Sequence, residues 1–222
     1  MMAKGKKSLA AANTTDEMVN MQSDHSCFSN DSEKTLRADA KQNRELILQA
    51  ARKIFSEKGL SVQISEIARM AGIGIGTIYR HFPTKEALFD AVSISYKQKL
   101  TEEAKALISH TDPGKTFFDF LSGIMEDGFT NRAARDAFRI GTFRARTEVS
   151  GAMLDLQSAC DDLLTRAQQA KAVREDINIM DLFALMSGLL MIVDELEDVS
   201  DTSRFHHLLA IVFDGLRFKT HD

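Results

Sequence analysis

The sequence predicts an all-α protein with a small N-terminal domain of three helices followed by a larger helical bundle. Two observations support this fold class. Only 2 of the 222 residues are proline, and 44% are hydrophobic, as in an ordinary globular protein. Beyond residue 36, apolar residues recur at spacings of three and four, which is the period of one face of an amphipathic helix.

The cysteines and the apolar stretches exclude several classes of protein. Cys27 and Cys160 lie far apart and belong to no CxxC pair, so they build neither a disulfide framework nor a zinc ligand set. The first residues lack the apolar core of a signal peptide, and no stretch approaches about 18 uninterrupted apolar residues. We therefore expect a cytoplasmic protein without a membrane span, a metal site or a cofactor.

Charge is distributed unevenly along the chain. The net charge is -4, yet residues 34–90 hold ten Lys or Arg against six acidic residues, whereas residues 91–222 hold 15 against 21. A basic segment beside an acidic remainder indicates that one part meets a polyanion, although a solvated face of mixed charge gives similar counts.

The N-terminal domain is expected within residues 36–84, after a tail. Residues 1–35 are rich in Ser, Asn, Thr and Asp without a period, which predicts disorder. From Arg37 onward, two apolar rows predict a helix that ends near Gly59, where glycine can adopt the left-handed conformation. The rows consist of Leu46, Ala50 and Ile54, and of Ile47, Ala51 and Phe55.

Two short helices complete this domain. The segment "SEIARMAG" predicts a helix that stops at Gly72, and "IGTIYRHF" predicts another that Pro83 ends, because the residue before proline avoids the helical region. Thr84 is a good N-cap for a long fourth helix that begins "KEALFDAVSISYKQKL".

The second domain is expected over residues 85–222, as helices with short connections. Beyond Pro113, five segments carry the helical spacing. They are residues 114–129, 132–146, 151–170, 179–196 and 203–218.

The glycines in "AGIGIGTIYRHF" admit two interpretations. A dinucleotide-binding turn needs G-x-G-x-x-G after a strand, but the spacing here is G-x-G-x-G and a helical pattern precedes it. A nucleotide-binding enzyme that uses Gly72, Gly74 and Gly76 is thus a remote alternative. A helix-turn-helix needs a small residue where the helices touch and often a glycine in the turn, and Ala68 and Gly72 supply both.

Three ordered motifs in residues 37–90 carry a family resemblance: "ILQAARKIFSEKG", "IARMAG" and "GTIYRHFPTKEALF". This region resembles the DNA-binding domain of tetracycline-repressor-type (TetR family) transcriptional regulators. The resemblance covers about a quarter of the chain, and the remainder is similar in length and helical pattern.

The resemblance implies a DNA contact for each matching position. Phosphate contacts fall to Thr77, Tyr79, His81 and Lys85, base-edge contacts to Ile75, Gly76 and Arg80, and phosphate or minor-groove contacts to Arg37, Lys41 and Arg44. Gln63 stands where the family usually has the Thr or Ser N-cap of the second helix. Ile75 stands where the family often has Lys or Arg, and it either contacts a thymine methyl or packs on the domain core.

The family also implies a homodimer and an effector site in the second domain. Dimer contacts are expected from Leu182, Leu185, Met186, Leu189, Leu208, Ile211, Val212 and Leu216. Apolar residues that could line an effector site are Phe117, Phe120, Met125, Phe129, Phe143, Met153, Leu156 and Phe183. For both sets the alternative is that they fill the core of one subunit.

We expect a transcriptional regulator rather than an enzyme. It would repress by binding an inverted-repeat operator in double-stranded DNA, and an apolar small molecule would change its affinity. A regulator without a small-molecule ligand, controlled by occupancy or by a protein partner, is the alternative.

Overall fold

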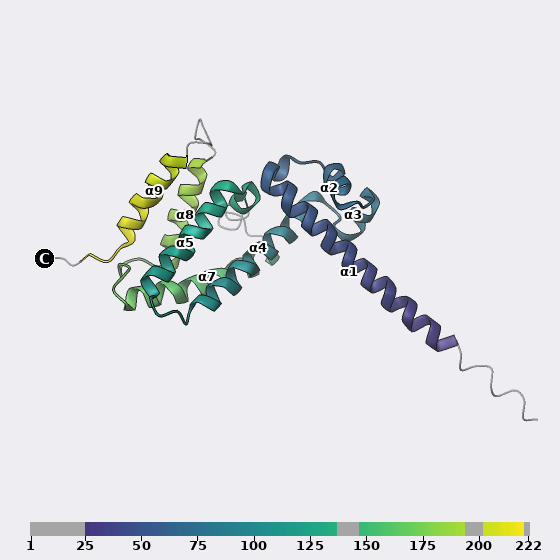
Figure 1. Ribbon diagram of the computed structural model, residues 1–222, viewed down its shortest axis with the longest axis horizontal. Helices are drawn as coiled ribbons and strands as arrows, with labels where there is room; N and C mark the ends of the chain where they lie inside the picture. The colour runs from purple at the N-terminus through teal and green to yellow at the C-terminus, as the bar shows by residue number, and fades with distance from the viewer. Residues whose placement is uncertain (1–24, 137–146, 194–201, 220–222) are drawn as a thin grey trace, which may run out of the picture. The chain divides into compact units, whose positions relative to one another are not determined.

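The computed structural model describes residues 25–136, 147–193 and 202–219, and these are helical with short connections (Figure 1). The predicted all-α class is confirmed, because the described residues contain no strand and only an isolated bridge that pairs Val173 with Arg217. No described helix is both long enough and apolar enough to cross a membrane.

The helices follow the predicted order. They are α1 (His25–Lys58), a 3₁₀ turn (Gly59–Ser61), α2 (Ile64–Ala71), α3 (Ile75–His81), α4 (Lys85–Leu107), α5 (Pro113–Thr130), α7 (Thr147–Gln169), α8 (Ile179–Val193) and α9 (Thr202–Leu216).

Helix α1 begins earlier than the sequence predicted. It starts at His25, so the expectation of a disordered tail is wrong for residues 25–35, while residues 1–24 lie outside the described part. An apolar row reveals only a helix that packs on one face, and the polar first turns of α1 have no such row. Residues 25–43 of α1 belong to one unit, and Arg44 begins the second.

Helix ends in the second unit follow local chemistry. Gly59 and Gly72 have φ angles of 58° and 67°, a region in which most side chains are strained. Thr84 accepts a hydrogen bond of 3.0 Å from the Ala87 N–H at the start of α4. Gln63 makes no side-chain cap at the start of α2, as its departure from the family pattern predicted.

The helices around α2 and α3 share one apolar core. Phe55 of α1 is fully buried and meets Phe89 of α4 edge to face, with ring centroids 5.3 Å apart. Ile67 of α2 and Ile78 of α3 are buried in the same cluster. These contacts fix both short helices against α1 and α4.

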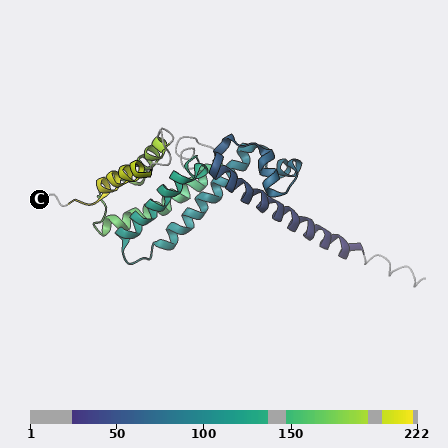
Figure 2. The ribbon, with the colours of Figure 1, turned by 45° about the horizontal axis from the view of Figure 1, so that its top comes forward.

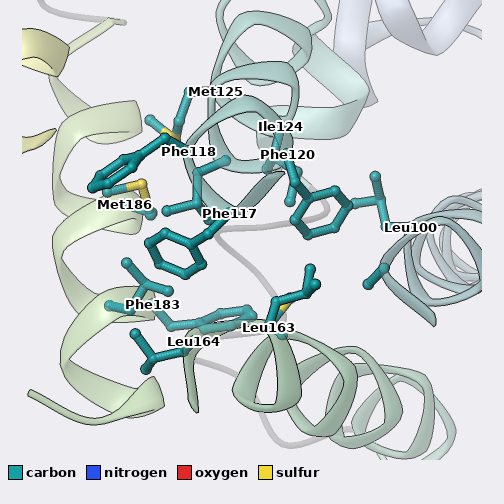
Figure 3. Packing of buried hydrophobic residues seen from close by; sticks show 14 of the residues in the cluster. Leu100, Phe117, Phe118, Phe120, Ile124, Met125, Leu163, Leu164, Phe183 and Met186 are labelled. Carbon is teal, nitrogen blue, oxygen red and sulfur yellow. The ribbon is translucent and has the colours of Figure 1, made fainter. Parts of the chain in front are cut away.

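A second apolar core fills the rest of this unit. Buried side chains from α4, α5, α7 and α8 converge in it (Figure 3). Helices α8 and α9 lie side by side (Figure 2), and Phe205 of α9 stacks on Phe129 of α5 with ring centroids 4.5 Å apart. Helix α4 takes part in both cores, through Val92 in the first and Leu100 in the second.

Candidate DNA-binding surface

Helix α3 is held by one buried face and a tight turn. Ile78 and Phe82 are buried against the first core. The turn after α2 closes where the Ile73 N–H donates to the Ala68 carbonyl at 3.0 Å. Because the inner face and the turn are both fixed, the opposite face of α3 is presented in one orientation.

Two rows of residues form this outer face. Ile75 and Tyr79, one helical turn apart, keep 45% and 47% of their surface exposed, and Gly76 and Arg80 form the exposed row beside them. The exposure of Ile75 contradicts the alternative that it packs on the domain core. Its contact with a thymine methyl stays a prediction.

The glycines at the start of α3 face open space. A methyl group added at Gly74 or Gly76 would meet no heavy atom within 4 Å, and neither residue has a positive φ. Nothing within the described fold therefore requires glycine at these two positions. Their effect is to leave the backbone of the helix N-terminus accessible to a partner.

The remaining predicted contact residues differ in their surroundings. Thr77 and His81 are half-buried on α3. The Lys85 ammonium donates to the Leu60 carbonyl at 2.7 Å, and the Arg44 guanidinium lies over the Phe82 ring, 5.3 Å from its centroid. Lys85 and Arg44 therefore make contacts within the protein, and their phosphate contacts stay predictions.

Arg37 and Lys41 belong to the unit that ends at Asn43. Both are exposed on α1, where basic side chains can meet solvent or a phosphate.

The residues predicted at the dimer interface divide into two groups. Leu182, Met186, Leu189 and Leu216 are buried within one subunit, so for them the alternative of a core position holds. Leu185 and Ile211 are 44% and 54% exposed, and Leu208 and Val212 are half-buried. Sequence reasoning did not select the exposed Met180, Met191 and Ile192 of α8, because every face of this helix carries apolar residues.

The apolar residues predicted to line an effector site lie together. Phe143 is outside the described residues. The other seven are buried in the second core, namely Phe117, Phe120, Met125, Phe129, Met153, Leu156 and Phe183. Four of them are labelled where they pack in Figure 3. Their contact with a ligand stays a prediction.

These features define a class of protein. A short helix with an exposed outer face follows a glycine turn and a second short helix, and this is the geometry with which helix-turn-helix proteins read the DNA major groove. The glycine run joins two helices in the described fold, so it lacks the strand that a nucleotide-binding turn requires.

Comparisons with known proteins agree with this class. Residues 47–92 match the family described as "Bacterial regulatory proteins, tetR family", and residues 112–218 match "Transcriptional regulator SbtR-like, C-terminal domain". An HTH-type transcriptional regulator of Staphylococcus aureus (strain USA300) is 46% identical over 54 residues, which cover 24% of this chain and 29% of the relative. This match therefore spans less than a third of that protein.

Solved structures match over a greater length. The TetR transcription regulatory protein from Mycobacterium vanbaalenii is 33% identical with a TM-score of 0.56, and the match covers 82% of this chain and 99% of the other. FadR from Bacillus subtilis, solved with stearoyl-CoA, shares the fold at 17% identity, with a TM-score of 0.53 and coverage of 78% and 99%. The chain belongs to the TetR family of transcriptional regulators, which are DNA-binding proteins.

Proposed function

We propose that the protein is a homodimeric repressor that inserts α3 into the major groove at each half of an inverted-repeat operator. The observation that carries this proposal is the outer face of α3. Arg80 and Tyr79 offer donors there, and the two glycines let the helix backbone approach the sugar-phosphate wall.

The dimer is supported by apolar residues that one subunit leaves exposed. Leu185 on α8 and Ile211 on α9 are large and accessible, and the two helices pack side by side. Exposed apolar side chains on two neighbouring helices favour contact with a second copy of the chain. A single short helix makes few phosphate contacts. A dimer carries two copies of α3 and so doubles their number.

The dimer is tested by placing a charge in this surface. Ile211→Asp should convert the dimer to a monomer at micromolar concentration, because an unpaired carboxylate is costly to bury. Leu154→Asp, at a position on α7 that is 64% exposed, is the matched control and should leave the dimer intact. Light scattering measures both masses, and a dimeric Ile211→Asp variant would contradict this interface.

Repression would be relieved by population shift. The dimer would have two states, one in which the two copies of α3 are spaced to fit the operator and one in which they are not. An apolar small molecule that binds the second state more tightly lowers operator affinity, at most by the ratio of its affinities for the two states. The same fold holds stearoyl-CoA in the Bacillus subtilis FadR, which supports an apolar ligand within the second domain.

A regulator without an apolar ligand is the second candidate. It is favoured by the dense packing of the second core, where Phe117 and Leu156 are each only 1% exposed. Fluorescence anisotropy with labelled operator distinguishes the two candidates. Release of the operator by fatty acids or other apolar metabolites supports the first, and unchanged affinity across such a set supports the second.

DNA binding itself is tested by its dependence on salt. Affinity should fall steeply as salt rises, because basic side chains displace counterions from phosphates. Arg80→Ala should relax the base preference of binding while the fold stays intact, since this side chain is exposed. If wild type also binds operator and mutated operators with equal affinity, as the variant does, the assignment of α3 as the reading helix is overturned.

A further inference from the structure

Lys85, the first residue of α4, reaches back along the chain to the connection between α1 and α2. Its ammonium donates to the Leu60 carbonyl at 2.7 Å and to the Val62 carbonyl at 3.4 Å. Lys85 is half-buried in this position. Because 25 residues separate Lys85 from Leu60, the tertiary fold forms this contact and a local turn does not.

The place of Lys85 at a helix N-terminus favours this contact. The first N–H groups of an α-helix carry partial positive charge, so a cation is disfavoured there and an acidic residue such as Glu86 is favoured. The Lys85 ammonium instead meets two carbonyl oxygens, which carry partial negative charge. A hydrogen bond from a charged donor is stronger than one between neutral groups.

The residues joined by this bond enclose the helix-turn-helix. Helices α2 and α3 both lie between Leu60 and Lys85 in the chain. The start of α2 lacks a common restraint, because Gln63 makes no side-chain cap there. The ion pair of Lys58 with Glu66 also holds this end of α2, but both side chains are exposed and such pairs contribute little. Lys85 therefore ties the end of the helix-turn-helix to its start.

We propose that Lys85 is a positioning residue for DNA binding, which holds α2 and α3 in the arrangement that presents the outer face of α3. This role differs from the phosphate contact that the family resemblance implies for the same residue. An ammonium bound to carbonyls within the protein raises DNA affinity by limiting the motion of α3 before binding. The effect on affinity rests on the proposed function, whereas the restraint on α2 and α3 does not.

The salt dependence of DNA affinity distinguishes the two roles. A phosphate contact by one Lys contributes about 0.9 to the slope of log affinity against log salt, so its loss lowers both the affinity and the slope. Loss of a positioning contact lowers the affinity by the same factor at every salt concentration. For Lys85→Met we expect an operator affinity roughly three- to tenfold below wild type, the value of one hydrogen bond, with an unchanged slope.

Lys105→Met is the matched control for the loss of one positive charge. Lys105 is exposed in the last turn of the same helix, about 30 Å from Lys85 at the rise of an α-helix. Fluorescence anisotropy at several salt concentrations, with an operator fragment recovered from a random pool, measures both variants. The control should match wild type in affinity and slope. Wild-type affinity in Lys85→Met, or a slope smaller by about 0.9, would overturn the positioning role.

Hydrogen exchange of the DNA-free protein tests the restraint itself. In Lys85→Met the amides of α2 and α3 should exchange roughly three- to tenfold faster than in wild type, because these helices lose a tie that limits their opening. The amides of α7 should keep their wild-type rates. Unchanged exchange in α2 and α3 would contradict the restraint. Equal acceleration in α7, with a lowered melting temperature, would show a general loss of stability and would also overturn the proposal.

Acylation of the wild-type protein provides a test that needs no variant. Acetic acid N-hydroxysuccinimide ester modifies free amines, and mass spectrometry of peptides gives the rate at each lysine. Lys85 should react more slowly than Lys105, because its amine is half-buried and bound to carbonyls. Equal rates would contradict the contact. If wild type binds no DNA, the proposed function fails, and exchange and acylation alone decide whether Lys85 restrains the helix-turn-helix.

Discussion

Replacing Gly76 by alanine separates the fold of α3 from its contact with DNA. An added methyl group meets no heavy atom within 4 Å in the protein, and the φ angle of Gly76 is not positive. Alanine favours a helix by up to about 1 kcal/mol over glycine. The variant should therefore be as stable as wild type or more stable, with a melting temperature raised by a few degrees at most.

DNA binding should respond in the opposite direction. If the backbone of α3 touches the sugar-phosphate wall at Gly76, a methyl group holds the helix away and lengthens its neighbouring hydrogen bonds. Loss of one or two bonds to charged phosphate oxygens costs about 1.5–3 kcal/mol each. We therefore expect operator affinity to fall at least roughly tenfold.

The assay pairs thermal unfolding with fluorescence anisotropy on labelled operator. Gly123→Ala is the matched control, because a methyl group there also meets open space and α5 lies outside the reading helix. It should share any gain in stability and bind DNA as wild type does. Wild-type affinity in the Gly76→Ala variant would refute the close approach of α3 to DNA.

Two further predictions concern the second domain. Gly114→Ala should lower the free energy of unfolding by about 1–3 kcal/mol in urea, because its methyl carbon would lie 2.5 Å from the Ala172 methyl; an unchanged midpoint would contradict this packing. A hydrogen bond with the Thr202 carbonyl and a second with Glu126 raise the pKa of His206. The protonated form thus stabilises the fold below about pH 6.5, and this stabilisation disappears as pH rises through the raised pKa. His206→Gln should lower the melting temperature more at pH 6 than at pH 8, and an equal effect at both would contradict the ion pair.

The helices and the turn around Gly72 could be predicted from the sequence because their signals are local. Gly59 and Gly72 take the left-handed conformation where the helices end, and Thr84 caps α4. The apolar rows of α1 also lie in the first core, as their spacing predicted, except that Leu46 at the start of one row is 38% exposed.

Exposure could not be predicted where a helix is apolar on every side. Leu182 and Leu185 are three residues apart on α8, yet the first is 1% exposed and the second 44%. Only the angle at which α8 packs on its neighbours decides between them, and this angle is a tertiary property. The exposure of Ile75 likewise depends on how α2 and α3 cross.

The burial and long-range contacts of polar side chains could not be predicted from the sequence. In the sequence, Ser93 and Tyr96 resemble any polar residues of a helix, yet the fold buries both of their hydroxyl groups. The contact of Lys85 with the Leu60 carbonyl is equally non-local, since 25 residues separate the two.

Selection of DNA from a random double-stranded pool at physiological salt tests the central claim most directly. The purified protein should retain fragments that share an inverted repeat, with half-sites about one helical turn apart, because a symmetric dimer presents two copies of α3. The Arg80→Ala variant should lose enrichment at defined base positions. Retained fragments without a shared sequence, or no retention at all, would contradict the account of α3 as a sequence-reading helix.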